Sequence, residues 1–191
     1  MENIQINNNR QELIDLLSAY KPFDTDDAIS YDEMVKFVTS SSNVFGNENP
    51  LGHITASAWI LSKDHSMVLL THHKKLNRWL QLGGHTEPDE YIRESAMREA
   101  LEESGLKHLK LVEDRIFDID VHMIPERGLI KQHLHYDVRF LFVVNDDQAF
   151  IISDESNDLK WIPLEALSTF TAEPSIMRML EKTILKFALN G

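Results

Sequence analysis

The stretch from Gly84 to Leu106, GHTEPDEYIRESAMREALEESGL, constrains the fold most, because a glycine-led loop runs directly into a long helical pattern. Pro88 suits the first turn of a helix, where its missing N–H costs nothing, and Gly105 suits the left-handed position that ends one. The sequence therefore predicts a helix from about Pro88 to Ser104. A narrow apolar stripe, which would allow close packing on a sheet, is formed by Ile92, Ala96 and Ala100.

Three carboxylates share one face of this predicted helix. At roughly 100° per residue, Glu102 and Glu103 fall within about 60° of Glu99 on either side. Like charges this close repel one another unless a cation lies among them, and hard oxygen ligands suit Mg²⁺ or Mn²⁺. Gly83 and Gly84 allow the preceding backbone to approach a ligand closely. The plainer alternative is a solvated helix face, and the spacing of the residues decides against it.

That spacing resembles the signature of the Nudix hydrolase superfamily (MutT-like). In the signature a Gly is followed after five residues by Glu, and after seven more by Arg-Glu-x-x-Glu-Glu-x-Gly and an aliphatic residue. The matching positions here are Gly84, Glu90, Arg98, Glu99, Glu102, Glu103, Gly105 and Leu106. Ala100, where a larger aliphatic residue is usual, is a mild departure. The resemblance covers about His53 to the C-terminus and leaves the first fifty residues outside.

The resemblance implies a Nudix-type α/β/α sandwich with a mixed β-sheet. It also implies hydrolysis of a diphosphate linkage in a nucleoside diphosphate derivative, by attack of water on phosphorus. By matching position, Glu99, Glu102 and Glu103 would be the ligands of Mg²⁺, with Mn²⁺ as an alternative, and Glu103 or a loop carboxylate would activate water. Arg98 would orient and charge-balance the glutamates. Glu90 is expected to be a partner of these residues rather than a metal ligand.

A further acidic residue is expected in a loop, because family members often carry one before a Trp. Glu155 lies six residues before Trp161 and would complete the metal shell or act as general base. Asp154 and Asp158 are rival candidates, and an ordinary polar loop residue is the plainer reading.

The segment Gln132–Asn145 is a candidate for substrate contact. As a strand it places alternate side chains on one face, and the polar ones are His133, His135, Asp137 and Arg139. Four polar residues in a row predict a ligand or solvent on that face. We expect Arg139 or His133 to touch phosphate or the group attached to it.

Two groups of residues precede the signature segment Gly84–Leu106, which we call the box. The histidines of the segment Gln132–Asn145 raise the alternative of a zinc site, to which His72 and His73 would add two imidazoles. His72 and His73 are neighbours on a strand, so they point to opposite sides and cannot easily share a metal. Contact of Arg139 or His133 with phosphate or the group attached to it is therefore expected in preference to a zinc site. Lys74, Lys75 and Arg78 form the main local basic group, which would guide a phosphate toward the box or would simply be a solvated loop.

The remaining elements follow from periodicity and turn residues. Helices are expected over Arg10–Tyr20 and over Pro174–Leu189. Another helix is expected to begin at Ser30–Glu33, which has the form of a capping box. Strands are expected over residues 53–62, 67–73, 79–84, 109–124 and 132–145, with a loop around Ser153–Leu159. Residues 1–50 are expected to form a helical extension packed on a main domain of residues 51–191. Aromatic residues on strands belong to the core more often than they stack on a base. We therefore expect Trp59, Trp79 and Trp161 to be structural.

The charge and composition of the chain limit the kinds of ligand that it is expected to bind. A net charge of −12 over 191 residues argues against nucleic-acid and anionic-membrane binding, but not against a metal-bridged diphosphate. The absence of Cys excludes thiolate sites. No signal peptide or long apolar run is evident, so a cytoplasmic location and a small-molecule partner are expected.

Several alternatives stay open at this stage. A nucleoside triphosphate, a nucleotide sugar, a CDP-alcohol and a dinucleotide all fit as substrate, and a homodimer is one option for the assembly. A catalytically silent Nudix-like module that senses or binds a nucleotide is the alternative function. Such modules would be expected to have lost box glutamates, which this chain keeps.

Overall fold

The computed structural model describes residues 7–187 except 88, 129–130, 146–148 and 155. The elements follow in the order α1 (Asn8–Ala19), α2 (Thr25–Ser40), β1 (Gly52–Leu61), β2 (Met67–His73), β3 (Arg78–Leu80), β4 (Leu82–His85), α3 (Ile92–Ser104), β5 (Leu109–Leu111), β6 (Asp118–Ile124), β7 (His133–Val144), β8 (Ser156–Pro163), η1 (Leu164–Thr169) and α4 (Pro174–Phe187). Within this described part, no helix is both long and apolar enough to cross a membrane.

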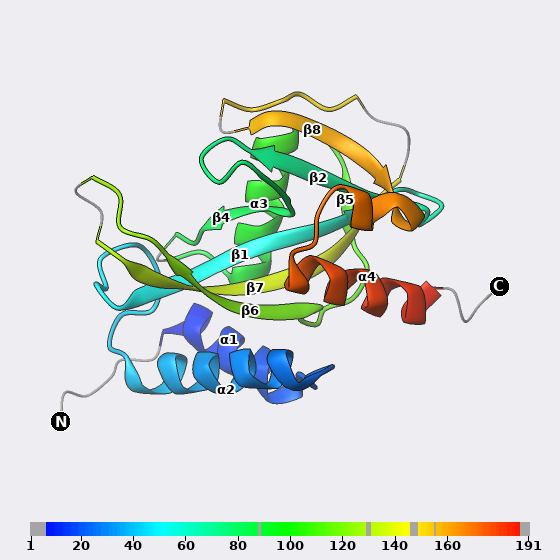
Figure 1. Cartoon of the computed structure of the whole chain (residues 1–191). Helices are drawn as coiled ribbons and strands as arrows, with labels where there is room; N and C mark the ends of the chain where they lie inside the picture. Colours follow the sequence, from blue (N-terminus) through cyan, green and yellow to red (C-terminus); the bar gives the residue numbers. More distant parts are fainter. Residues whose placement is uncertain (1–6, 88, 129–130, 146–148, 155, 188–191) are drawn as a thin grey trace.

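The sheet is built on a parallel pair, β1 and β7, which are in register from Gly52 opposite Leu134 to Leu61 opposite Val143. Two antiparallel strands share the other edge of β1, with β4 on its first half and β2 on its second. In the same way β6 and β5 share the far edge of β7. β2 continues the sheet to β3 and β8. Because each central strand forks to two partners, the sheet curls rather than lying flat (Figure 1).

Helices cover both faces of this mixed sheet (Figure 1). α1, α2 and α3 share a core with residues such as Ile54, Val138 and Phe140, whereas α4 packs on a second cluster around Trp59 and Leu141. β1 is buried at every position because both of its faces are covered. The expected α/β/α sandwich with an N-terminal pair of helices is confirmed.

The N-terminal helices contact both the sheet and α4. Phe37 of α2 stacks on Tyr136 of β7, with ring centroids 4.0 Å apart. Asp27 of α2 accepts a hydrogen bond from Lys182 of α4 at 2.8 Å. Lys182 also donates to Asp118 of β6 at 2.6 Å. One lysine therefore joins three parts of the chain through buried carboxylates.

Several expectations about elements were wrong. α2 begins at Thr25, because the side chain of Asp24 accepts a hydrogen bond from the N–H of Asp27 at 2.8 Å. Ser30 therefore lies inside the helix and does not cap it. β8 is a strand where a loop was expected, because it pairs along β2. The segment 109–124 divides into β5 and β6, which pair with different parts of β7.

The expected strand 79–84 also divides. β3 pairs with β2, whereas β4 pairs with β1, so the chain changes partner at Gln81. This change places the two glycines of β4 directly beside β1.

Candidate active site

The box helix α3 begins four residues later than the sequence predicted, at Ile92. Its N-cap, Tyr91, makes no side-chain capping bond. The cap comes instead from α1, where the Glu12 carboxylate accepts from Ile92 N at 3.1 Å and from Arg93 Nε at 2.8 Å. Pro88, where the sequence predicted the start of the helix, lies outside the described residues.

The rest of α3 agrees with the sequence. The apolar stripe is fully buried against the sheet at Ile92, Ala96 and Ala100. Gly105 ends the helix with φ of 66° and donates its N–H to Leu101 O at 2.8 Å.

Two of the three box carboxylates lie against the glycines of β4. A Cβ added to Gly84 would lie 2.6 Å from Glu99 Oε2, so only a glycine leaves room for this carboxylate. Glu103 Oε2 accepts a hydrogen bond from the N–H of Gly83 at 2.9 Å. The third carboxylate, Glu102, has a side chain that is 61% exposed. The close glycine backbone thus fixes Glu99 and Glu103, while Glu102 reaches solvent.

Arg98 holds the carboxylates together. Its Nη1 donates to Glu99 at 2.8 Å and to Glu102 at 3.3 Å. Its Nη2 donates to Glu90 at 3.1 Å and to the carbonyl of His85 at 2.9 Å. Burial opposes its charge, but these partners outweigh burial and raise the pKa of Arg98 above its usual value. One guanidinium therefore ties the box helix to the loop before it and to β4.

Glu90 lies in that loop and not on the helix, as a consequence of the late helix start. Its carboxylate accepts from Ser95 Oγ at 2.6 Å and from Arg98 Nε at 3.2 Å. Burial favours its neutral form, but the hydrogen bonds from Arg98 and Ser95 outweigh burial, so the pKa of Glu90 lies below its usual range. These contacts suit a residue that orients the arginine.

The donor set of this site suits a divalent cation. Glu99, Glu102 and Glu103 offer oxygen donors only, and Mg²⁺ and Mn²⁺ prefer such ligands. A side chain at Gly84 would crowd the Glu99 carboxylate. Because residue 84 is a glycine, this carboxylate can lie directly against the backbone of β4. The residues present therefore fit the metal that the resemblance implies.

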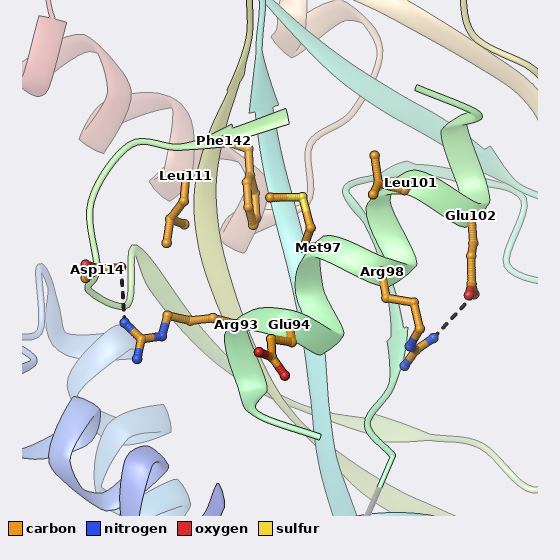
Figure 2. Close-up of a pocket in the computed structure, with 9 residues that line it drawn as sticks. All are labelled: Arg93, Glu94, Met97, Arg98, Leu101, Glu102, Leu111, Asp114 and Phe142. Atoms are coloured by element: carbon orange, nitrogen blue, oxygen red, sulfur yellow. Dashed lines mark hydrogen bonds and ion pairs between the residues drawn. The ribbon is translucent and has the colours of Figure 1, made fainter. Parts of the chain in front are cut away.

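A groove of about 630 Å³ runs along the other side of α3 (Figure 2). Its apolar part consists of Met97, Leu101, Leu111 and Phe142. Arg93 and Asp114, joined at 3.1 Å, lie at one end, and Arg98 and Glu102 lie at the other. α3 thus has Glu99 and Glu103 on the side toward β4 and an apolar groove on the side toward β5, with Glu102 at the edge of the groove.

Two expected substrate residues are held by ion pairs. Arg78 on β3 pairs with Glu173 at 2.7 Å, and its side chain is 61% exposed. Arg139 is 2% exposed, and its three guanidinium nitrogens lie within 3.2 Å of Asp118, Asp120 and Asp137. Burial opposes the charge of Arg139, but the three carboxylates outweigh it and raise its pKa. Each guanidinium nitrogen of this arginine thus has a carboxylate partner, which supports a structural role.

The polar face of β7 is therefore neither solvated nor an open ligand surface at its centre. Asp137 is 1% exposed and accepts from Thr55 at 3.0 Å, Ser57 at 2.8 Å and Gln81 at 3.0 Å. Polar residues on neighbouring strands satisfy it, which alternation on a single strand could not reveal. Trp59 is buried as expected and donates to Thr183 at 2.9 Å.

His133 and Glu155 complete the comparison with the sequence. Glu155 lies outside the described residues. His133 lies beside His135, with their Nε2 atoms 3.3 Å apart, and both belong to a cluster with His53 and His85. Sequence reasoning missed this cluster, because His53 and His85 come from other strands and only the pairing of β1 and β4 brings them to β7.

Comparisons with known proteins agree with the box. Residues 51–182 match the family model described as NUDIX domain. The division of the chain into an N-terminal extension of residues 1–50 and a main domain of residues 51–191 stays a prediction, because the family match does not test it. No curated protein sequence matches the chain significantly.

Solved structures show the same fold. A C. elegans Ap4A hydrolase binary complex has a TM-score of 0.58 and 21% identity, covering 71% of this chain and 97% of that one. A Nudix hydrolase from M. smegmatis has a TM-score of 0.55 and 15% identity, covering 73% and 89%. The E. coli dihydroneopterin triphosphate pyrophosphohydrolase has a TM-score of 0.54 and 17% identity, covering 78% and 100%.

The family match covers well over half of the chain and includes the box helix, both glycines of β4 and the whole curled sheet. The chain therefore belongs to the NUDIX domain family and is a Nudix hydrolase.

Proposed function

We propose that this chain is a Mg²⁺-dependent pyrophosphohydrolase that cleaves a diphosphate linkage in a nucleoside diphosphate derivative by attack of water on phosphorus. The observation that carries the proposal is the arrangement of α3 against β4. Glu99 and Glu103 lie against Gly84 and Gly83, and Arg98 fixes the carboxylates. Family membership adds the reaction class, since Nudix hydrolases act on such linkages.

Glu99, Glu102 and Glu103 would hold the metal. When bound, Mg²⁺ neutralises phosphate oxygens and lowers the pKa of a coordinated water. The protein's own part is to hold the carboxylates in place, which Gly83 does through its N–H and Arg98 through its guanidinium. Such preorganised groups cost no rearrangement during the reaction.

Two carboxylates are candidates for activating the water. Glu103 is one, because its Oε2 is already oriented by Gly83. Glu155 is the other, by its place before Trp161. Among its rivals, Asp158 lies 3.6 Å from Lys160 on β8, which supports a surface role for Asp158 and leaves Glu155 and Asp154 as the loop candidates.

The first test compares two glutamates on one helix. Glu103→Gln keeps the size of the side chain but removes its charge, and we expect metal-dependent turnover to fall at least about a hundredfold. Glu94→Gln is the matched control, because Glu94 is exposed on the groove side of α3. Both variants should keep the melting temperature of the unchanged chain. Retained hydrolysis by Glu103→Gln would refute the assignment.

The readout is phosphate or monophosphate release with Mg²⁺ over nucleoside triphosphates, nucleotide sugars, CDP-alcohols and dinucleotides. The products identify the bond that is cleaved, and Glu155→Gln in the same assay tests the loop carboxylate. An identical rate and metal affinity in Glu155→Gln removes that residue from the site. Tight nucleotide binding without release on any substrate would instead favour the silent sensing module.

A further inference from the structure

Histidines from four adjacent strands meet on one face of the sheet. His53 of β1 is in register with His135 of β7, and His135 is in register with His122 of β6. His85 of β4 is in register with Thr55, two residues from His53. Paired residues, and residues two apart on a strand, point to the same face. The register therefore gathers these rings at the end of the sheet where β1 and β7 begin and β4 ends (Figure 1).

The rings are close enough to share one ion. The ring centroid of His53 lies 4.9 Å from that of His85 and 4.7 Å from that of His135. One ring nitrogen from each of the three lies within 4.8 Å of the others. A tetrahedral Zn²⁺ site with Zn–N bonds of about 2.0–2.1 Å needs donors about 3.4 Å apart, so nitrogens within 4.8 Å of one another must close by at most about 1.4 Å. His85 is exposed and can make this movement.

His53 is the histidine that most needs an explanation. It is 3% exposed, and among the described residues neither of its ring nitrogens has a hydrogen-bond partner. A buried polar atom without a partner costs about 1–3 kcal/mol in other proteins, and a metal bond would satisfy it. The face that His53 points to holds the other histidines, so an ion bound there would lie within its reach.

His133 is oriented as a fourth ligand. Its Nδ1 lies 2.8 Å from the backbone carbonyl of Lys131. A carbonyl can only accept, so Nδ1 carries the proton and Nε2 of the neutral ring carries a lone pair. That Nε2 lies 3.3 Å from Nε2 of His135. A backbone carbonyl that fixes the tautomer of a metal-bound histidine is a usual feature of metal sites.

We propose that His53, His85, His133 and His135 form a transition-metal site for Zn²⁺, separate from the carboxylate site of the box. Four imidazoles suit Zn²⁺, Cu²⁺ and Ni²⁺ far better than Mg²⁺, and Zn²⁺ accepts a tetrahedral arrangement most readily. The chain has no Cys that could bind the ion instead.

The two sites lie on opposite faces of β4. A side chain at Gly84 would point at Glu99 of α3, whereas one at Gly83 would meet Ser57, on the face of β1 that carries His53. His85, two residues after Gly83, shares this second face. An ion held by the histidines is therefore not an ion of the box helix.

The test uses the full chain free of any affinity tag, titrated with Zn²⁺ against a chromophoric chelator without nucleotide. We expect one Zn²⁺ per chain, and a Co²⁺-loaded sample should show the absorption bands of four-coordinate Co²⁺. His85→Gln and His135→Gln should each weaken Zn²⁺ binding at least about tenfold. His72→Gln, on β2 outside the cluster, is the matched control and should bind as tightly as the unchanged chain.

Thermal unfolding guards against a folding artefact. Zn²⁺ should raise the melting temperature of the unchanged chain and of Glu103→Gln, but not of His135→Gln. Glu103→Gln should remove hydrolysis but leave Zn²⁺ binding unchanged. The proposed hydrolysis and the proposed zinc site can therefore fail independently of each other. Unchanged Zn²⁺ affinity in both His85→Gln and His135→Gln, or no Zn²⁺ bound by the unchanged chain, overturns the proposal.

Discussion

Gly83 and Gly84 are neighbours in β4, yet a side chain would meet quite different surroundings at each. At Gly84 the nearest atoms are the end of the flexible Glu99 side chain, with Oε2 at 2.6 Å. At Gly83 they are Ser57 Oγ and fixed backbone, with Ala56 O at 2.6 Å, and φ is 153°. A carboxylate can move aside, but strand backbone cannot. The missing side chain at Gly84 therefore leaves room for the site, whereas the missing side chain at Gly83 leaves room for the strand backbone.

We expect alanine to separate these two roles. Gly84→Ala should displace the Glu99 carboxylate and lower activity about 10- to 100-fold, with the free energy of unfolding changed by less than about 1 kcal/mol. Gly83→Ala should cost about 1–3 kcal/mol of stability through backbone crowding and positive φ. Urea unfolding and steady-state rates measure the pair. Equal effects of the two substitutions on both quantities would contradict this division.

At the scale of single elements, α3 depends on a residue far away in the sequence. The first N–H groups of any helix need acceptors, and Glu12 supplies one for Ile92 from α1. The carboxylate also lies near the positive end of the helix dipole, which favours a negative charge. Its side chain is 11% exposed, and Arg93 pairs with it at 2.6 Å. The box helix is thus held at its start by the N-terminal extension.

Removing this cap should be measurable. We expect Glu12→Ala to lower the free energy of unfolding by about 0.5–2 kcal/mol, the usual cost of losing a helix cap. Asp32→Ala, at an exposed position of α2, is the control and should stay within about 0.5 kcal/mol. Urea titration followed by circular dichroism gives both values. A Glu12→Ala chain as stable as the control would show that water caps α3 equally well.

Local signals explain which parts of the structure the sequence predicted. The stripe of Ile92, Ala96 and Ala100 and the stop at Gly105 are written in consecutive residues, and both were correct. The helix start was wrong because its cap comes from Glu12, eighty positions away. The histidine cluster and the burial of Arg139 depend on strand pairing in the same way. Spacing along the chain predicts a helix face, but not which strands lie side by side.

At the scale of the whole molecule, a buried charge network joins elements that are distant in sequence. Asp118 of β6 is fully buried and receives Arg178 and Lys182 of α4 at 2.8 and 2.6 Å, and Arg139 of β7 at 3.1 Å. Lys182 continues the network to Asp27 of α2 at 2.8 Å. Paired buried charges are tolerated only while each keeps its partners.

Lys182→Met tests this network. Without the ammonium group, Asp27 keeps only neutral donors such as Tyr20 Oη, and we expect a loss of about 3–5 kcal/mol in the free energy of unfolding. Lys186→Met removes a partly exposed lysine from its pair with Glu113 one turn later on α4 and should cost at most about 1 kcal/mol. Guanidinium unfolding of both variants gives the comparison. Losses of similar size in both would show that the network does not depend on Lys182.

The hydrogen bond from Ile92 at the start of α3 to the Glu12 carboxylate of α1 also crosses the boundary of the family match. The family match begins at residue 51, whereas the acceptor for Ile92 lies in the 12 residues of α1. The region matched by the family model is therefore smaller than the region whose contacts hold α3. A substitution in α1 that removes this acceptor would then alter the start of the helix that carries Glu99, Glu102 and Glu103.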